Sequence, residues 1–211
     1  KEYRRQRQMC IRDRALSVYR FIDSVDKDMG DVLVTGGTGG VAVIATKILI
    51  KLGYSVVVST GKLEEQKEVL LNLGVKDVIH RSEVDDNSGR PLLRPRWAGV
   101  IDTVGGNTLA TAIKTTNYCG AVTTCGNAGG VDFTSSVYPF ILKGITLSGI
   151  DSVDCPMNLR LKIWDLLSNE WKLDDLDDMV NVVSLEELND SIDSIMAGKH
   201  VGRTVVDLEK I

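Results

Sequence analysis

The stretch that decides the fold is Asp31-Val-Leu-Val-Thr-Gly-Gly-Thr-Gly-Gly-Val-Ala42. Residues 32–35 are apolar or β-branched and predict a strand, and the apolar run 41–50 after the glycines predicts a helix. Between them, Gly37-Thr-Gly-Gly-Val-Ala42 fits the pattern G-x-G-x-x-G/A, in which the first glycine makes the tight turn and the second admits a pyrophosphate against the backbone. The phosphates would then bind the free N–H groups at the start of the helix. The sequence therefore predicts a dinucleotide-binding turn, and the alternative is a βα turn without a ligand.

The end of the second predicted strand, residues 54–60, indicates which dinucleotide this turn would hold. In a Rossmann fold an acid about 20 residues past the glycines binds the ribose 2′-hydroxyl of NAD. Here that position reads Ser59-Thr-Gly-Lys62, and Glu64 and Glu65 fall inside the next predicted helix. Hydroxyls and an ammonium suit a 2′-phosphate, so NADP(H) is favoured over NAD(H). The alternative is that Lys62 is solvated and Ser-Thr-Gly is an ordinary helix entry.

Size and composition indicate one full core and part of a second. The chain has 211 residues, of which 43% are hydrophobic, and no apolar run approaches the ~20 residues of a membrane span. Without a signal peptide, we expect a soluble cytoplasmic protein with no membrane partner. The four cysteines are widely spaced and lack C-x-x-C pairing, which argues against a metal site or a disulfide framework. We expect Cys119 and Cys125 to lie in a buried strand.

The first 14 residues carry a net charge of +4, although the whole chain carries −4. A basic arm of this kind would normally suggest a nucleic-acid partner. However, Met9-Cys-Ile-Arg-Asp-Arg14 resembles the translated end of a transposon used as a sequencing adapter. We therefore expect residues 1–14 to be an artefact, the natural sequence to begin near Ala15, and no nucleic acid to bind.

Strands and helices alternate along most of the chain. The predicted strands are residues 32–35, 54–60, 77–80, 98–102, 120–125 and 144–149. This order predicts an α/β fold, a Rossmann doubly wound parallel six-stranded sheet within residues 15–152. Residues 153–211 form a helix-helix-strand appendage whose last strand, 202–207, has no obvious place in that sheet. Ligands lie beyond the carboxyl ends of such strands, which makes 103–105, 126–127 and 151–152 candidates, although glycines and Asx residues are also common in ordinary loops.

Several stretches together resemble the medium-chain dehydrogenase/reductase superfamily, specifically its zinc-free quinone oxidoreductase-like branch and the acrylyl-CoA reductase (NADPH) group. The resemblance extends from about Ala15 to the end of the chain. The matching stretches are Val34-Thr-Gly-Gly-Thr-Gly-Gly-Val41, Thr60-Gly-Lys62, Val78-Ile-His-Arg81, Trp97-Ala-Gly-Val-Ile-Asp-Thr-Val-Gly105, Tyr118-Cys-Gly-Ala-Val122, Pro139-Phe-Ile-Leu142, Gly149-Ile-Asp-Ser-Val153 and Gly202-Arg-Thr-Val205.

This resemblance implies a metal-free reductase that passes hydride from NADPH to a conjugated enoyl thioester such as acrylyl-CoA, or alternatively to a quinone. It implies no catalytic residue, because the positioned cofactor supplies the chemistry. Ala42 departs from the family's usual glycine, and Asn127 stands where the family often has an apolar residue, so we expect a backbone contact there. The implied cofactor contacts are Thr38, Gly39, Gly40 and Val41 for the pyrophosphate, Thr60, Gly61, Lys62 and Arg81 for the 2′-phosphate, Asn127, Ile141 and Ser152 toward the nicotinamide, and Arg203.

The resemblance further implies an N-terminal GroES-like catalytic domain for which this chain has no sequence. We therefore expect a fragment that is inactive alone, with substrate-side residues in the missing domain and an exposed apolar patch along 153–211, the segment that would return to it. A homodimer is possible. Three other classes are alternatives. A short-chain dehydrogenase would need a Tyr followed by Lys four positions later, which this sequence lacks, and a methyltransferase would usually have an acid after the second strand. The third alternative is a non-catalytic NADP-binding module.

Overall fold

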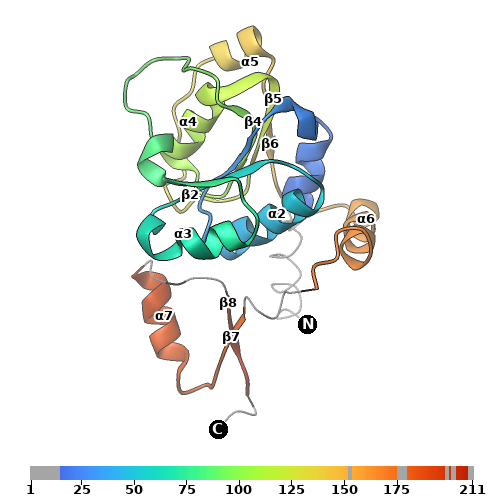
Figure 1. Cartoon of the computed structure of the whole chain (residues 1–211), viewed down its shortest axis with the longest axis vertical. Coiled ribbons are helices and arrows are strands. Elements are labelled where there is room, and N and C mark those ends of the chain that lie inside the picture. Colours follow the sequence, from blue (N-terminus) through green and yellow to red (C-terminus); the bar gives the residue numbers. More distant parts are fainter. Residues whose placement is uncertain (1–14, 152–153, 175–179, 198–199, 201–202, 209–211) are drawn as a thin grey trace.

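A wholly parallel six-stranded sheet forms the centre of the molecule (Figure 1). The computed structural model describes residues 15–151, 154–174, 180–197, 200 and 203–208. The strand order is β3-β2-β1-β4-β5-β6, so the chain runs outward from β1 in both directions, as the sequence predicts. The strands are β1 (Val32–Val34), β2 (Val56–Thr60), β3 (Asp77–His80), β4 (Trp97–Asp102), β5 (Thr116–Thr124) and β6 (Thr146–Gly149).

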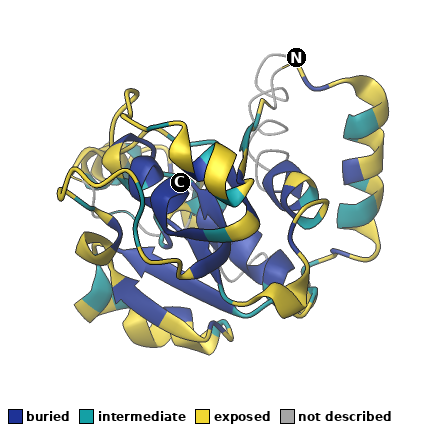
Figure 2. Ribbon diagram, turned by 90° about the horizontal axis from the view of Figure 1, so that it is seen from above, coloured by how far each residue is buried: buried dark blue, intermediate teal, exposed yellow. Residues whose placement is uncertain are grey.

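Helices cover both faces of this sheet. A helix over residues 15–22 precedes η1 (Lys27–Met29), and η2 (Arg81–Val84) follows β3. The helices that connect strands are α2 (Gly40–Lys51), α3 (Leu63–Asn72), α4 (Gly106–Thr115) and α5 (Tyr138–Lys143). Buried residues are concentrated in the sheet and on the inner sides of the helices (Figure 2).

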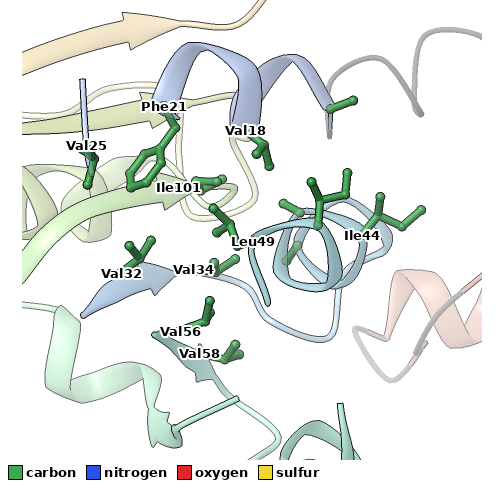
Figure 3. Packing of buried hydrophobic residues seen from close by; sticks show 14 of the residues in the cluster. Val18, Phe21, Val25, Val32, Val34, Ile44, Leu49, Val56, Val58 and Ile101 are labelled. Atoms are coloured by element: carbon green, nitrogen blue, oxygen red, sulfur yellow. The ribbon is translucent and has the colours of Figure 1, made fainter. Parts of the chain in front are cut away.

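The strand side chains alternate between two cores because successive residues of a strand point to opposite faces. Val34, Val58 and Ile101 pack with the helix 15–22, α2 and Leu70 of α3 (Figure 3). Leu33 and Val100 face the other way and pack against α4. Each face is therefore apolar, which explains why the central strands read as continuous hydrophobic runs.

Residues after 153 add α6 (Met157–Ser168), β7 (Val180–Val183), α7 (Leu188–Met196) and β8 (Arg203–Val206). β8 lies outside the six-stranded sheet, as expected, and pairs in parallel with β7, a strand that the sequence analysis missed (Figure 1). Ile163 and Trp171 nevertheless belong to the core of the sheet. The boundary at residues 152 and 153 stays a prediction, and the interpretation of residues 1–14 falls outside the described residues.

Exposed apolar side chains are numerous in this C-terminal segment, as the sequence predicts. The most exposed are Met157, Leu161, Met196 and Leu208, which are 61%, 62%, 82% and 78% exposed. The expectation of a buried Cys119 is wrong, since Cys119 is exposed and has a left-handed φ of 57° at an irregular part of β5. Cys125, just past the end of β5, is half-buried. None of the helices in the described part of the chain has the length and apolarity needed to span a bilayer.

Candidate functional site

The glycine turn leads from β1 directly into α2 and is fastened to the neighbouring strand. The backbone N–H of Gly37 donates to the carbonyl of Ser59 at 2.9 Å, and the N–H of Gly39 donates to the carbonyl of Gly36 at 2.8 Å. No side chain caps α2, whose N-cap residue is the exposed Gly39. The first N–H groups of this 12-residue helix are therefore presented beside a bare backbone, which is the arrangement that binds phosphate in Rossmann folds.

The glycines of this turn have separate structural tasks. The turn needs Gly36 as well as Gly37, because Gly36 has the left-handed φ of 65° and the hydrogen bond from the Gly39 N–H to the Gly36 carbonyl encloses Gly37 and Thr38. Gly37 is needed for close packing, because a Cβ there would overlap Val58 of β2. A Cβ at Gly39 would approach only the carbonyl of Gly36, at 3.1 Å, and would otherwise occupy open space. Thr38, Gly40 and Val41 are half-buried around it.

The predicted 2′-phosphate residues lie together where β2 and β3 end. Thr60 is buried, and its hydroxyl accepts a hydrogen bond from the N–H of Lys62 at 3.1 Å. The side chain of Arg81, which begins η2, runs against Gly61, and a Cβ at Gly61 would lie 3.2 Å from Arg81 Nε. The absence of a side chain at Gly61 thus lets the guanidinium approach the end of β2. Glu64 and Glu65 lie in the first turn of α3, as predicted.

Lys62 also contacts the C-terminal segment. Its ammonium donates a hydrogen bond to the backbone carbonyl of His200 at 2.6 Å. Partial burial lowers the pKa of Lys62 below its ordinary value, against an opposing effect of Glu65. A cation that has lost part of its hydration, and whose hydrogen-bond partner among the described residues is a neutral carbonyl, is well suited to bind an anionic group. Sequence reasoning did not anticipate His200 here, and nothing in its pattern points to it.

A buried carboxylate joins the ends of β1, β4 and β5. Asp102, the last residue of β4, is 0% exposed. Its Oδ1 accepts from Thr35 Oγ1 at 2.8 Å and from the N–H of Val104 at 3.2 Å. Its Oδ2 accepts from the N–H of Gly105 at 3.0 Å and from Thr124 Oγ1 at 2.9 Å. The sequence analysis noted Asp102 only within a matching stretch, although an acid at the end of an apolar strand before Thr-Val-Gly was a usable signal.

The loops after β4 and β5 pack backbone against backbone. The N–H of Gly129 donates to the carbonyl of Val104 at 2.7 Å, and a Cβ at Gly126 would overlap the carbonyl of Thr103. Gly105 has a φ of 74°, and a Cβ there would lie 3.3 Å from the Cα of Asn127. This contact places Asn127, which is exposed, beside the carboxyl ends of β4 and β5.

Two predicted residues are not brought to this edge, and a third is not described. Ile141 is 68% exposed on α5, whose last residue Lys143 donates to the carbonyls of Lys114 and Thr116 at 2.8 and 3.0 Å, beside the start of β5. Burial lowers the pKa of Lys143. Arg203 begins β8, in the separate two-stranded sheet (Figure 1). Ser152 falls outside the described residues, and all three assignments stay predictions.

Metal ligands do not gather in the part of the chain that the structure describes. No three side chains of His, Cys, Asp or Glu lie close enough together there to hold a metal ion. A zinc ion therefore has no ligand set among these residues.

The parallel sheet, the glycine turn and the strand-end loops define a Rossmann-type α/β domain. Residues 40–169 match the family model described as zinc-binding dehydrogenase, so the chain belongs to this family of medium-chain dehydrogenases/reductases. Metal ligation is not implied by this match, given the described side chains.

Relatives of known sequence and structure agree with this membership. The chain is 42% identical over 196 residues to the putative quinone oxidoreductase YhfP of Bacillus subtilis, covering 92% of this chain and 59% of that protein. It is 39% identical over 179 residues to the acrylyl-CoA reductase AcuI of Ruegeria pomeroyi, covering 85% of this chain and 54% of that protein. The chain thus spans a little over half the length of these curated relatives.

Two solved structures superpose on most of the chain. The crystal structure of YhfP with NAD bound has a TM-score of 0.86 at 42% identity and covers 93% of this chain and 60% of that one. The yhdH oxidoreductase of Salmonella enterica in complex with NADP has a TM-score of 0.89 at 34% identity and covers 95% of this chain and 61% of that one.

Proposed function

We propose that this chain carries the NADPH-binding domain of a reductase that transfers hydride to the β-carbon of a conjugated enoyl thioester such as acrylyl-CoA. The observation that carries the proposal is the group formed by Thr60, Lys62 and Arg81 beside the glycine turn, with no acid at the end of β2. Two cations and a hydroxyl at this position favour a 2′-phosphate over a free 2′-hydroxyl.

The residues of this chain would bind and orient the cofactor. Thr38, Gly39, Gly40 and Val41 would hold the pyrophosphate at the start of α2, where N–H groups are unpaired. Thr60, Gly61, Lys62 and Arg81 would hold the 2′-phosphate. The loops 103–106 and 126–130, with the backbone of Asn127, would receive the nicotinamide half. NADPH would supply the hydride when bound, and no side chain of this chain is assigned as an acid or base.

The names of the relatives support an enoyl thioester as the hydride acceptor. AcuI of Ruegeria pomeroyi is named an acrylyl-CoA reductase, and the yhdH structure contains NADP. A quinone is the second candidate acceptor, because YhfP is named a putative quinone oxidoreductase at 42% identity. The YhfP structure contains NAD, so cofactor choice is the first property to measure.

Calorimetry with NADPH and NADH tests the cofactor part of the proposal. We expect tighter binding of NADPH, and equal affinities would contradict it. Because the chain covers 54% of AcuI, hydride transfer is best measured on a chimera in which residues 15–211 replace the corresponding part of that reductase. NADPH oxidation by the chimera with acrylyl-CoA, and its absence with a quinone, would support the enoyl thioester. The reverse result would favour the quinone. Sedimentation of the same protein would test the predicted homodimer.

A further inference from the structure

The strand order places Asp102 at the point where the sheet changes direction. β1 pairs with β2 on one side and with β4 on the other, so the chain reverses between β1 and β4. A dinucleotide lies across this point, with its adenosine half over the first three strands and its nicotinamide half over the second three. The glycine turn and the group around Lys62 belong to the first half. The loops that follow β4 and β5 belong to the second half, and the Asp102 carboxylate accepts hydrogen bonds from the first of these loops and from the last residue of β5.

Asp102 uses both of its carboxylate oxygens to accept hydrogen bonds from two backbone N–H groups and from two threonine hydroxyls. The N–H groups of Val104 and Gly105 donate to it at 3.2 and 3.0 Å, which sets the loop in which Gly105 has a left-handed φ. Through Thr124 Oγ1, at 2.9 Å, it fixes the end of β5 from which the 126–130 loop departs. The carbonyl of Asp102 accepts from the N–H of Cys125 at 3.0 Å, so main chain and side chain act on the same strand end.

The link to β1 is equally direct. Thr35 Oγ1 donates to Asp102 and accepts from the N–H of Thr103 at 2.9 Å, while Thr103 Oγ1 donates to the carbonyl of Thr35 at 2.8 Å. The two loops pack so closely that a Cβ at Gly105 or Gly106 would lie less than 3 Å from backbone atoms of the 126–130 loop. A displacement of the 103–106 loop would therefore be passed on to the 126–130 loop.

We propose that Asp102 is a positioning residue for the nicotinamide half of the cofactor. It holds the loops 103–106 and 126–130 in the shape that receives this half, whereas the adenosine half depends on the glycine turn and on Thr60, Lys62 and Arg81. The inference rests on the proposed function, since it assumes that a nicotinamide dinucleotide binds at this edge of the sheet.

The substitution Asp102→Asn tests this role with little change in shape. An amide has one acceptor oxygen and one donor nitrogen, so in either orientation it faces the N–H of Val104 or the N–H of Gly105 with a second donor. We expect the affinity for NADPH to fall at least about tenfold, because a buried N–H is left without an acceptor and the loop moves away from it. The affinity for adenosine 2′,5′-bisphosphate, which contains only the adenosine half, should be unchanged.

Asp31→Asn is a matched control at the opposite end of the sheet. Asp31 also accepts side-chain hydrogen bonds, from Ser55 at 2.7 Å and from Lys76 at 2.7 Å, just before β2 and β3, but it lies just before the start of β1. We expect it to leave both affinities unchanged. A merely structural role of Asp102 would lower the affinities for NADPH and for the bisphosphate together, and that result would overturn the inference. So would an unchanged affinity for NADPH.

A milder pair of variants decides the question if Asp102→Asn does not fold. Thr124→Val removes one donor to Asp102 at the end of β5, whereas Thr116→Val removes the bond from Thr116 Oγ1 to the carbonyl of Ala112, at 2.7 Å, at the start of the same strand. We expect only Thr124→Val to weaken NADPH binding relative to the bisphosphate, and equal behaviour of the two variants would overturn the inference. If the wild-type chain bound neither ligand, the proposed function would fail, and the inference with it.

Discussion

The ammonium of Lys62 donates a 2.6 Å hydrogen bond to the backbone carbonyl of His200. This contact joins the end of β2 to a residue 138 positions later in the chain. A phosphate dianion is a stronger acceptor for an ammonium than a neutral carbonyl is. If NADPH binds as proposed, Lys62 therefore has to turn from His200 toward the 2′-phosphate or share its donors between the two.

Lys62→Ala should reduce the preference for NADPH over NADH by about 1–3 kcal/mol, the range for a hydrogen bond to a charged group. NADH has no 2′-phosphate, so its affinity should remain unchanged. Lys51→Ala is the control, because the Lys51 ammonium likewise donates to a backbone carbonyl of the C-terminal segment, that of Lys172, but lies at the far end of α2. Calorimetry with both nucleotides gives the result. An equal loss of affinity for NADH would show that Lys62 acts on the shared part of the two cofactors.

Asp31→Asn should lower stability in a pH-dependent manner. Burial raises the pKa of Asp31, but the hydrogen bonds from Lys76 and Ser55 and the charge of Lys76 outweigh it, so the pKa lies below its ordinary value. A carboxyl whose pKa is lower in the folded state stabilises the fold above its unfolded pKa, and this contribution is lost as the pH falls through the folded value.

The expected difference in the free energy of unfolding at neutral pH is about 0.5–1 kcal/mol, since the Lys76 side chain is 57% exposed and solvent screens the pair. Urea titrations of both proteins between neutral pH and acid should converge at the acid end. A difference that is constant over this range would mean that the pair with Lys76 is not its source.

Trp171→Ala should cost about 3–5 kcal/mol of stability, as for other buried tryptophans. Trp171 is 1% exposed and belongs to the same core as Val18 and Phe21, although it follows the predicted domain boundary. Trp164→Ala is the control, because Trp164 on α6 is only half-buried. A single cooperative unfolding transition that shifts with Trp171→Ala would show that the segment around α6 folds with the sheet. Two separate transitions would place it in its own unit.

The doubly wound sheet could be predicted because its determinants are local. The run Val32–Val34 is apolar on both faces, the glycines follow it directly, and the same alternation of strand and helix recurs along the chain. β7 could not be predicted in this way. It has four residues, of which two are exposed, and its pairing with β8 depends on a segment 20 residues away.

The candidate site was predictable where its residues lie close together in the sequence, at the ends of strands. Thr60 ends β2 and is followed by Gly61 and Lys62, and Arg81 follows the end of β3, so parallel pairing of β2 and β3 brings them together. The Asp102 hydrogen bonds depend instead on Thr35 and Thr124, which are 67 and 22 positions away. The role of Gly36 was missed for another reason, since the motif fits only from Gly37 onward and therefore does not include Gly36.

Gly39→Ala and Gly37→Ala should separate binding from stability within one turn. A Cβ at Gly39 would approach only the carbonyl of Gly36, at 3.1 Å, and Gly39 has an extended backbone with φ of −74° that any residue can adopt. We expect a loss of stability of about 1 kcal/mol or less, because the site is exposed. A Cβ at Gly37 would overlap Val58 in the core, so we expect a loss of about 3 kcal/mol there.

NADPH binding should depend on Gly39 rather than on Gly37, the reverse of the order expected for stability. Gly39→Ala, and more so Gly39→Val, should weaken NADPH binding in a protein that remains folded, because the added carbons occupy the space in which the pyrophosphate would meet the backbone. Denaturant titration gives the stability of each variant, and calorimetry under conditions in which it is folded gives the affinity. Normal NADPH binding by a folded Gly39→Val variant would show that this glycine serves only the turn.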